Sequence, residues 1–153
     1  MSLQSVRAFL SAHAPDIEVM ETEARTATVQ EAADAHEVVP GQIAKTLTLK
    51  VQDEIILLVM GGDTKIDNRK YKDRFKQKPR MLAADEVAQW TGHPVGGVCP
   101  FGLPHDMRIF VDRTLQRFET VLPAAGAVNA AIRIEPDRLA ELVDAQWVDV
   151  ARD

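Results

Sequence analysis

Two features of the sequence combine residue types and spacing that suit chemistry: a lysine within an apolar strand pattern, and a glycine-rich loop. Residues 42–51 alternate with a period of two, and Lys45 shares its phase with Leu47 and Leu49. An ammonium on an apolar face is unfavourable unless it reaches water, a partner or a ligand. Lys45 is therefore either a cation for a ligand or a residue at the start of the strand whose ammonium extends to solvent.

The glycine-rich loop spans residues 96–102 and reads Gly-Gly-Val-Cys-Pro-Phe-Gly. Glycine adopts backbone angles that other residues avoid and lets another molecule approach the main chain closely. Proline fixes its own φ and removes a donor. The apolar side chains within the loop indicate that it is held against the body of the protein. The pattern predicts either rigid N–H and C=O groups presented to a small ligand or a tight, partly buried connection.

Cys99, the one cysteine of the chain, raises two alternatives. A nucleophilic thiol needs a nearby base or positive charge to lower its pKa, and no catalytic motif links Cys99 to His93 or His105. The spacing of His93, Cys99 and His105 along the chain also matches no common zinc site. We therefore expect Cys99 to pack in the loop or line a pocket, and we expect no metal.

The chain around these residues alternates between strand and helix patterns. Strands are predicted over residues 17–22, 42–51, 54–60, 107–111, 118–122, 131–134 and 146–150. Helices are predicted between Ser2 and Pro15, from the capping box at Thr28 toward His36, and over residues 68–75, 85–90 and 136–143. The first long pair of strands predicts an antiparallel hairpin. The mixture predicts an α+β fold, in which a mixed, curled sheet is flanked by helices.

Length and composition fit a single domain over residues 1–153, long enough to bury a core. Hydrophobic residues make up 46% and charged residues 27% of the chain, which is typical of a soluble domain. No apolar run is long enough to span a membrane, and no secretory signal is recognisable. A single cysteine rules out an internal disulfide, so we expect a reducing cytoplasm.

The net charge of −5 argues against a general, non-specific nucleic-acid binder, and DNA is not an expected partner. One segment is nevertheless strongly basic. Its cations are Lys65, Arg69, Lys70, Lys72, Arg74, Lys76, Lys78 and Arg80. Such a run is either a solvated face or a surface that contacts phosphates.

Four stretches, in this order, carry a resemblance to a known family: Gly41–Leu47, Val95–Gly102, the strand that ends at Asp112, and Ala125-Gly126 before a strand. They resemble the YbaK/EbsC family, which includes the editing domains associated with prolyl-tRNA synthetase. The likeness covers essentially the whole chain. The lysine strand and the Gly-Gly-x-x-Pro loop at this separation are together fairly specific.

The resemblance implies a barrel-like sheet flanked by helices and an aminoacyl-tRNA deacylase that acts in trans. Such enzymes hydrolyse the ester between a wrong amino acid and the terminal adenosine of tRNA, so the implied partners are the acceptor end of aminoacyl-tRNA and, in some cases, a synthetase. No metal or organic cofactor is implied. Lys45 matches the family's key polar residue, which stabilises charge or positions the ester. Substrate contacts are expected from Thr46, Gly96, Gly97, Val98, Cys99, Pro100, Phe101, Gly102, Asp112, Gly126 and Asn129.

The sequence leaves the substrate and the attacking group open. It has no clear nucleophile–base pair, so water or the ribose hydroxyl of the substrate would attack, while loop N–H groups stabilise the oxyanion. Some subfamilies carry a histidine where this chain has Leu122, and Asn129 is a candidate for the missing polar contact. Esters of Ala, Ser, Thr or Cys all remain candidates. A non-catalytic tRNA- or synthetase-binding module and a small-ligand regulator are the alternatives, which deacylation assays separate.

Overall fold

The computed structural model describes residues 2–152. Its helices, with 3-10 helices labelled η, are α1 (Ser2–His13), α2 (Val29–His36), η1 (Pro40–Gln42), α3 (Asn68–Phe75), α4 (Ala84–Thr91), η2 (Arg113–Arg117) and α5 (Pro136–Leu142). Its strands are β1 (Met20–Glu21), β2 (Ile43–Val51), β3 (Glu54–Gly61), β4 (Arg108–Asp112), β5 (Leu122–Pro123), β6 (Ala130–Ala131) and β7 (Gln146–Val148). Within residues 2–152, no helix has the length and apolar character needed to cross a bilayer.

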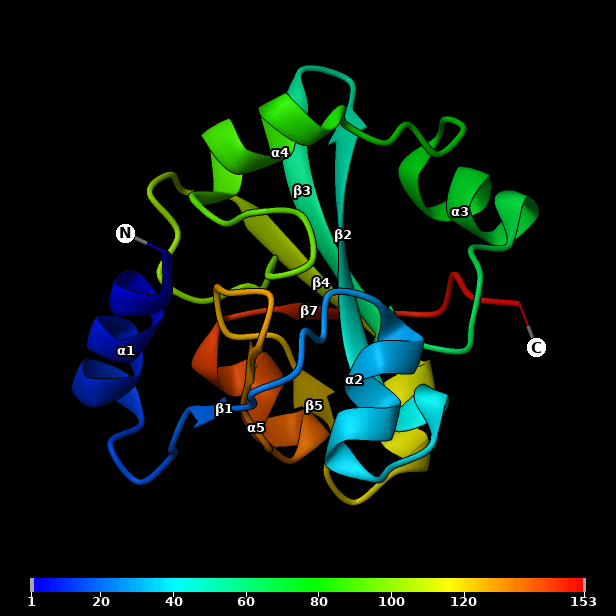
Figure 1. The fold of residues 1–153 in the computed structure, drawn as a ribbon. Coiled ribbons are helices and arrows are strands. Elements are labelled where there is room, and N and C mark those ends of the chain that lie inside the picture. Colours follow the sequence, from blue (N-terminus) through cyan, green and yellow to red (C-terminus); the bar gives the residue numbers. More distant parts are fainter. Residues whose placement is uncertain (1, 153) are drawn as a thin grey trace.

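The main sheet has five strands in the order β5-β2-β3-β4-β7. The pair β2–β3 is an antiparallel hairpin, and the other three pairs are parallel. Strands β1 and β6 form a separate two-stranded ribbon. The predicted hairpin and the mixed α+β sheet are therefore confirmed, and Figure 1 shows the hairpin running through the middle of the molecule with helices around it.

Strand β3 is the centre of the protein because both of its faces are buried. Successive side chains of a strand point to opposite faces. Leu57 belongs to a core that contains Val6 of α1, and Leu58 belongs to a second core that contains Tyr71 of α3. Figure 1 accordingly shows α1 and α3 on opposite sides of the hairpin. This double burial explains the continuous apolar run in β3.

Three helix ends form through the local signals that the sequence contains. At α2, the Thr28 hydroxyl accepts a hydrogen bond from the Glu31 N–H at 3.1 Å and the Glu31 carboxylate accepts one from the Thr28 N–H, which completes the capping box. Asp67 caps α3 as predicted, because its carboxylate accepts hydrogen bonds from the N–H groups of Arg69 and Lys70. Gly92 ends α4 with a left-handed φ of 73°.

Four strands are longer in the prediction than in the structure. The predicted strands at residues 17–22, 118–122, 131–134 and 146–150 correspond to the shorter β1 (Met20–Glu21), β5 (Leu122–Pro123), β6 (Ala130–Ala131) and β7 (Gln146–Val148). For the second of these, the reason lies at the end of β4. The Asp112 carboxylate accepts a hydrogen bond from the Thr114 N–H at 2.9 Å and caps η2, so the chain turns before it reaches the sheet again.

The outer edge of β2 is covered in two places with a gap between them. β5 pairs with Ile43 and Ala44. Further along, the Lys50 N–H donates to the Arg80 carbonyl and the Leu82 N–H donates to the Thr48 carbonyl. Among the residues that the structure describes, neither covering segment pairs with Thr46. The backbone of Thr46 is therefore an open edge in the middle of the sheet.

Candidate functional site

A cavity of about 390 Å³ lies at the open edge of β2. This volume is within the range of pockets that hold small molecules. Its lining comes from residues 26–32, 43–48, 81–87, 95–98 and 122–131. Most lining side chains are alanine, valine, leucine or isoleucine, so the walls are largely apolar and polar groups there stand out.

Two of those polar groups are threonine hydroxyls of β2. Thr46 and Thr48 share one phase of the strand and both line the cavity. Their Oγ1 atoms are buried, and neither has a hydrogen-bond partner among the residues that the structure describes. A buried hydroxyl without a partner is unfavourable by about 1–3 kcal/mol.

Gly96 allows the loop to approach the segment before α2. Its φ is 93°, and a Cβ atom there would lie 2.8 Å from the Cβ of Ala27. Gly97 makes a similar approach on its other side, because a Cβ atom would lie 2.7 Å from the backbone nitrogen of Ala127. Because glycine has no Cβ, the loop can approach these two segments closely, and these contacts fix it as a wall of the cavity.

Lys45 lies on β2 and lines the same cavity. The ammonium donates to the carbonyl of Gly62 at 3.4 Å and to the carbonyl of Thr64. Gly62 is packed against the cavity-lining Val29, since a Cβ atom on Gly62 would lie 2.6 Å from a methyl group of Val29. Partial burial lowers the pKa of Lys45 below its ordinary value, although the nearby Asp63 carboxylate opposes that shift.

The mouth of the cavity has exposed apolar side chains beside a basic stretch. Met81 and Val95 line the cavity and are 54% and 57% exposed. Arg80 precedes Met81 directly, and Lys76 and Lys78 lie just before it, all three exposed. An apolar rim next to cations suits a ligand that combines a flat ring with phosphate groups.

Residues 23–142 match the model of a known protein family, the aminoacyl-tRNA editing domain. The chain belongs to the aminoacyl-tRNA editing domain family. A relative from Bacillus subtilis (strain 168), an uncharacterized protein named YwhH, is 44% identical over 100% of this chain and 99% of its own length. The proline–tRNA ligase of Kosmotoga olearia is 31% identical over 58% of this chain but only 16% of its own length.

A solved structure extends the likeness to the whole editing domain. It is described as a "putative trans-editing enzyme for prolyl tRNA synthetase", and it superposes with a TM-score of 0.91 at 29% identity over 99% of this chain and 98% of its own. Together with the family match, it confirms the fold and the resemblance that the motifs carried.

The cavity of this editing domain brings together only some of the residues that the sequence predicts for the site. Lys45, Thr46, Gly96 and Val98 line it. The other predicted residues, described next, are not among the residues that line it. Sequence reasoning missed Thr48, Met81 and the residues before α2. For Thr48 the signal was present, because it is a polar residue on the same strand phase as Thr46.

The second half of the glycine-rich loop is part of the core. Cys99 and Phe101 are completely buried in the cluster that contains Val6, and Pro100 is buried as well. Gly102 has a φ of 63°, and a Cβ atom there would lie 2.6 Å from the Ser5 carbonyl of α1. This half of the loop therefore anchors α1.

Cys99 lies beside His93 at a sulfur–nitrogen distance of 3.5 Å, but both side chains are buried. Burial raises the pKa of the Cys99 thiol to about 12, so it keeps its proton at neutral pH. The His93 ring also bonds the Phe101 carbonyl at 2.7 Å and the Ser2 hydroxyl at 2.7 Å. These contacts fasten the loop to α1 and do not make an accessible nucleophile.

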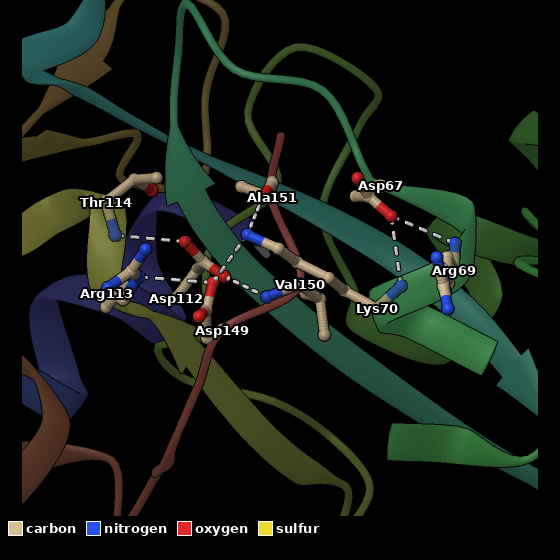
Figure 2. Close-up of polar contacts among 9 residues, drawn as sticks. All are labelled: Asp67, Arg69, Lys70, Asp112, Arg113, Thr114, Asp149, Val150 and Ala151. Atoms are coloured by element: carbon tan, nitrogen blue, oxygen red, sulfur yellow. Dashed lines mark hydrogen bonds and ion pairs between the residues drawn. The ribbon is translucent and has the colours of Figure 1, made fainter. Parts of the chain in front are cut away.

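Asp112 is completely buried, and its carboxylate bonds to the backbone. Its carboxylate accepts hydrogen bonds from the N–H groups of Thr114 and Val150, at 2.9 and 2.8 Å. Figure 2 shows these two bonds beside the Lys70 ammonium, which bonds the Asp149 carboxylate at 3.2 Å. Asp112 thus joins η2 to the chain after β7.

Gly126 and Asn129 hold the segments behind the cavity. The Gly126 N–H donates to the Gly97 carbonyl at 3.0 Å, and the Asn129 amide donates to the Thr22 carbonyl at 2.9 Å. Both residues thereby position Ala124 and Ala130, which do line the cavity. Across residues 2–152, no three His, Cys, Asp or Glu side chains gather closely enough to hold a metal ion.

Proposed function

We propose that this chain is a trans-acting aminoacyl-tRNA deacylase, which hydrolyses the ester of a mischarged tRNA that carries Ala, Ser, Thr or Cys. The family supports an aminoacyl-tRNA as the substrate. The observation that carries the proposal is a mostly apolar cavity of about 390 Å³ that combines Lys45 with the open backbone edge at Thr46. Such a cavity fits a small aminoacyl group, and its exposed mouth leaves room for the terminal adenosine.

The proposed reaction uses water or the neighbouring ribose hydroxyl to attack the ester carbonyl. The negative charge that develops on the carbonyl oxygen requires donors that are already in place. Backbone N–H groups of Gly96 and Val98 are candidate donors. Lys45 supplies a fixed positive charge, and its long side chain lets the ammonium exchange the Thr64 carbonyl for the substrate.

The test is hydrolysis of tRNAs mischarged with Ala, Ser, Thr or Cys by the wild type, Lys45→Ala and the matched surface variant Lys50→Ala. We expect turnover of at least one substrate, a loss of about 100-fold or more in Lys45→Ala, and little change in Lys50→Ala. Full activity of Lys45→Ala would contradict the proposed role of Lys45. No turnover of any substrate, with or without a synthetase, would contradict the deacylase.

A non-catalytic tRNA-binding module is the second candidate, and the basic stretch at the mouth favours it. Lys76, Lys78 and Arg80 are exposed and lead directly to the cavity. For this module we expect uncharged tRNA to bind with an affinity that falls steeply with salt, together with no ester hydrolysis.

A further inference from the structure

The Lys45 ammonium is held by the turn that follows β3, residues 61–64. It donates to the carbonyls of Gly62, at 3.4 Å, and Thr64. The residue between these two acceptors is Asp63, which carries a carboxylate. Among the residues that the structure describes, Lys45 nevertheless forms no ion pair with Asp63 or with any other carboxylate. The ammonium therefore rests on neutral acceptors, although a carboxylate belongs to the same turn.

The Asp63 carboxylate is bound instead by Arg117 of η2. A terminal guanidinium nitrogen of Arg117 lies 2.8 Å from a carboxylate oxygen of Asp63. The guanidinium also donates through its Nε to the Thr114 carbonyl at 2.7 Å, which fixes its orientation. Thr114 is in turn tied to the end of β3, because its hydroxyl accepts a hydrogen bond from the Gly61 N–H at 3.0 Å. The pair thus joins the turn to η2 in a defined geometry.

Two glycines leave the space that this ion pair occupies. A Cβ atom on Gly61 would lie 2.6 Å from a terminal nitrogen of Arg117. A Cβ atom on Gly41 would lie 3.0 Å from an Asp63 carboxylate oxygen and 3.1 Å from the same guanidinium. Neither glycine has a positive φ, so the backbone conformation does not require glycine there. Both charged side chains are about half-exposed, and such a pair contributes little to stability. Its geometry therefore needs another explanation.

We propose that Arg117 is a positioning residue for Lys45. By binding the Asp63 carboxylate to η2, it keeps the Lys45 ammonium on two carbonyls from which the substrate ester can displace it. An ammonium leaves a neutral carbonyl more readily than a carboxylate, because the carboxylate adds the attraction of a full negative charge. This inference rests on the proposed function, in which Lys45 must reach the substrate.

The first experiment measures kcat/KM on the preferred mischarged tRNA for the wild type, Arg117→Gln, the double variant Arg117→Gln/Asp63→Asn, and Arg138→Gln. We expect Arg117→Gln to lose about tenfold or more, because Asp63 then captures the Lys45 ammonium. The double variant should regain most of that loss, since it has no carboxylate at the turn. Arg138 forms a matched exposed pair with Asp16 at 2.6 Å and does not line the cavity, so Arg138→Gln should keep full activity.

The second experiment measures the pKa of Lys45 by NMR in protein labelled with ¹³C at the lysine Cε, with the signal assigned by its absence in Lys45→Ala. Burial lowers this pKa, the Asp63 carboxylate raises it, and the Lys65 ammonium lowers it. In Arg117→Gln the pKa of Lys45 should rise above the wild-type value, because no guanidinium neutralises Asp63. In the double variant the pKa should fall below that of Arg117→Gln. A purely structural role of Arg117 would not produce this pattern.

Three results would overturn the inference. The first is unchanged activity of Arg117→Gln, and the second is a loss that Asp63→Asn does not relieve. The third is an unchanged pKa of Lys45 in Arg117→Gln, because Asp63 would then have turned to Lys65 or to solvent. Failure of Arg117→Gln to fold would overturn it too, since Arg117 would be needed for the structure itself.

Absence of any hydrolysis by the wild type would contradict the proposed function, and the titration of Lys45 then tests the positioning separately. A rise in the pKa of Lys45 in Arg117→Gln, reversed in the double variant, would support the inference without any turnover. An identical pKa in all three proteins would overturn it.

Discussion

The two halves of the glycine-rich loop, the first taken together with the preceding Val95, both combine glycine with apolar residues, but they lie in different environments. Residues 95–98 lie at the cavity, where Val95 is 57% exposed. Residues 99–102 lie beneath α1, where Cys99 and Phe101 have no exposed surface. One half forms a wall for a ligand, and the other half fixes that wall to the core.

The glycines of the two halves contact different parts of the protein. Gly96 lies against Ala27, which lines the cavity, whereas Gly102 lies against the backbone of Ser5 in α1. Both adopt a positive φ, so both positions need glycine, but for contacts with different parts of the protein. Substitutions in the two halves should therefore separate activity from stability.

The largest expected effect is in the core half. Gly102→Val adds a β-branched side chain at a φ of 63°, where a Cβ atom would lie 2.6 Å from the Ser5 carbonyl. We expect the free energy of unfolding to fall by about 3 kcal/mol or more, as measured by urea denaturation. A loss below about 1 kcal/mol would show that α1 is not anchored by this contact.

In the cavity half, Val98→Phe should reduce activity and leave stability nearly unchanged. The larger side chain can extend into the cavity rather than into packed core, so the substrate and not the fold loses space. We expect kcat/KM on the preferred mischarged tRNA to fall at least about tenfold, with a change in unfolding free energy within about 0.5 kcal/mol. Unaltered activity would place the substrate elsewhere.

The adjacent residue should behave in the opposite way. Cys99→Ala removes a completely buried sulfur atom, and we expect the free energy of unfolding to fall by about 1–2 kcal/mol. Deacylation per folded molecule should be retained, because the protonated thiol does not reach the cavity. Complete loss of activity in a folded Cys99→Ala variant would contradict the division of the loop.

The smallest effect is a pH dependence of stability that comes from the same thiol. Burial raises the pKa of Cys99 from an ordinary 9.0 to about 12, so the unfolded chain loses its proton at lower pH than the folded chain. The resulting stabilisation is present below pH 9 and is lost as pH rises from 9 toward 12. Between pH 9 and 10 the loss should be about 1 kcal/mol relative to Cys99→Ser. Parallel stability curves for the two proteins would indicate an accessible thiol.

Local signals predicted the elements well, and long-range contacts decided the site. The capping residues Thr28 and Asp67 could be identified from the sequence because each bonds to an N–H group no more than three residues further along the chain. The period of two predicted that Thr46 and Thr48 share one face of the strand. The gap beside Thr46 was not predictable, because it depends on where β5 ends and where Leu82 begins to pair.

The different environments of the two halves of the loop could not be predicted from the sequence either. Apolar residues occur in both halves, and only the position of α1 decides which half is covered. The contacts of the Lys45 ammonium likewise depend on the turn after β3, which brings the carbonyls of Gly62 and Thr64 to it. The carboxylate of Asp112, a residue expected at the substrate, accepts one local hydrogen bond from the Thr114 N–H and one from the Val150 N–H, and no local pattern specifies the second.

The most direct test of the cavity as the substrate site is an amide chemical-shift titration of the ¹⁵N-labelled protein with seryl-adenosine that carries an amide in place of the ester. The account predicts that the largest shifts occur at Thr46, Gly96 and Val98, and that Cys99 and Gly102 change little. Shifts centred on Cys99 and Gly102, with Thr46 and Gly96 unaffected, would contradict it.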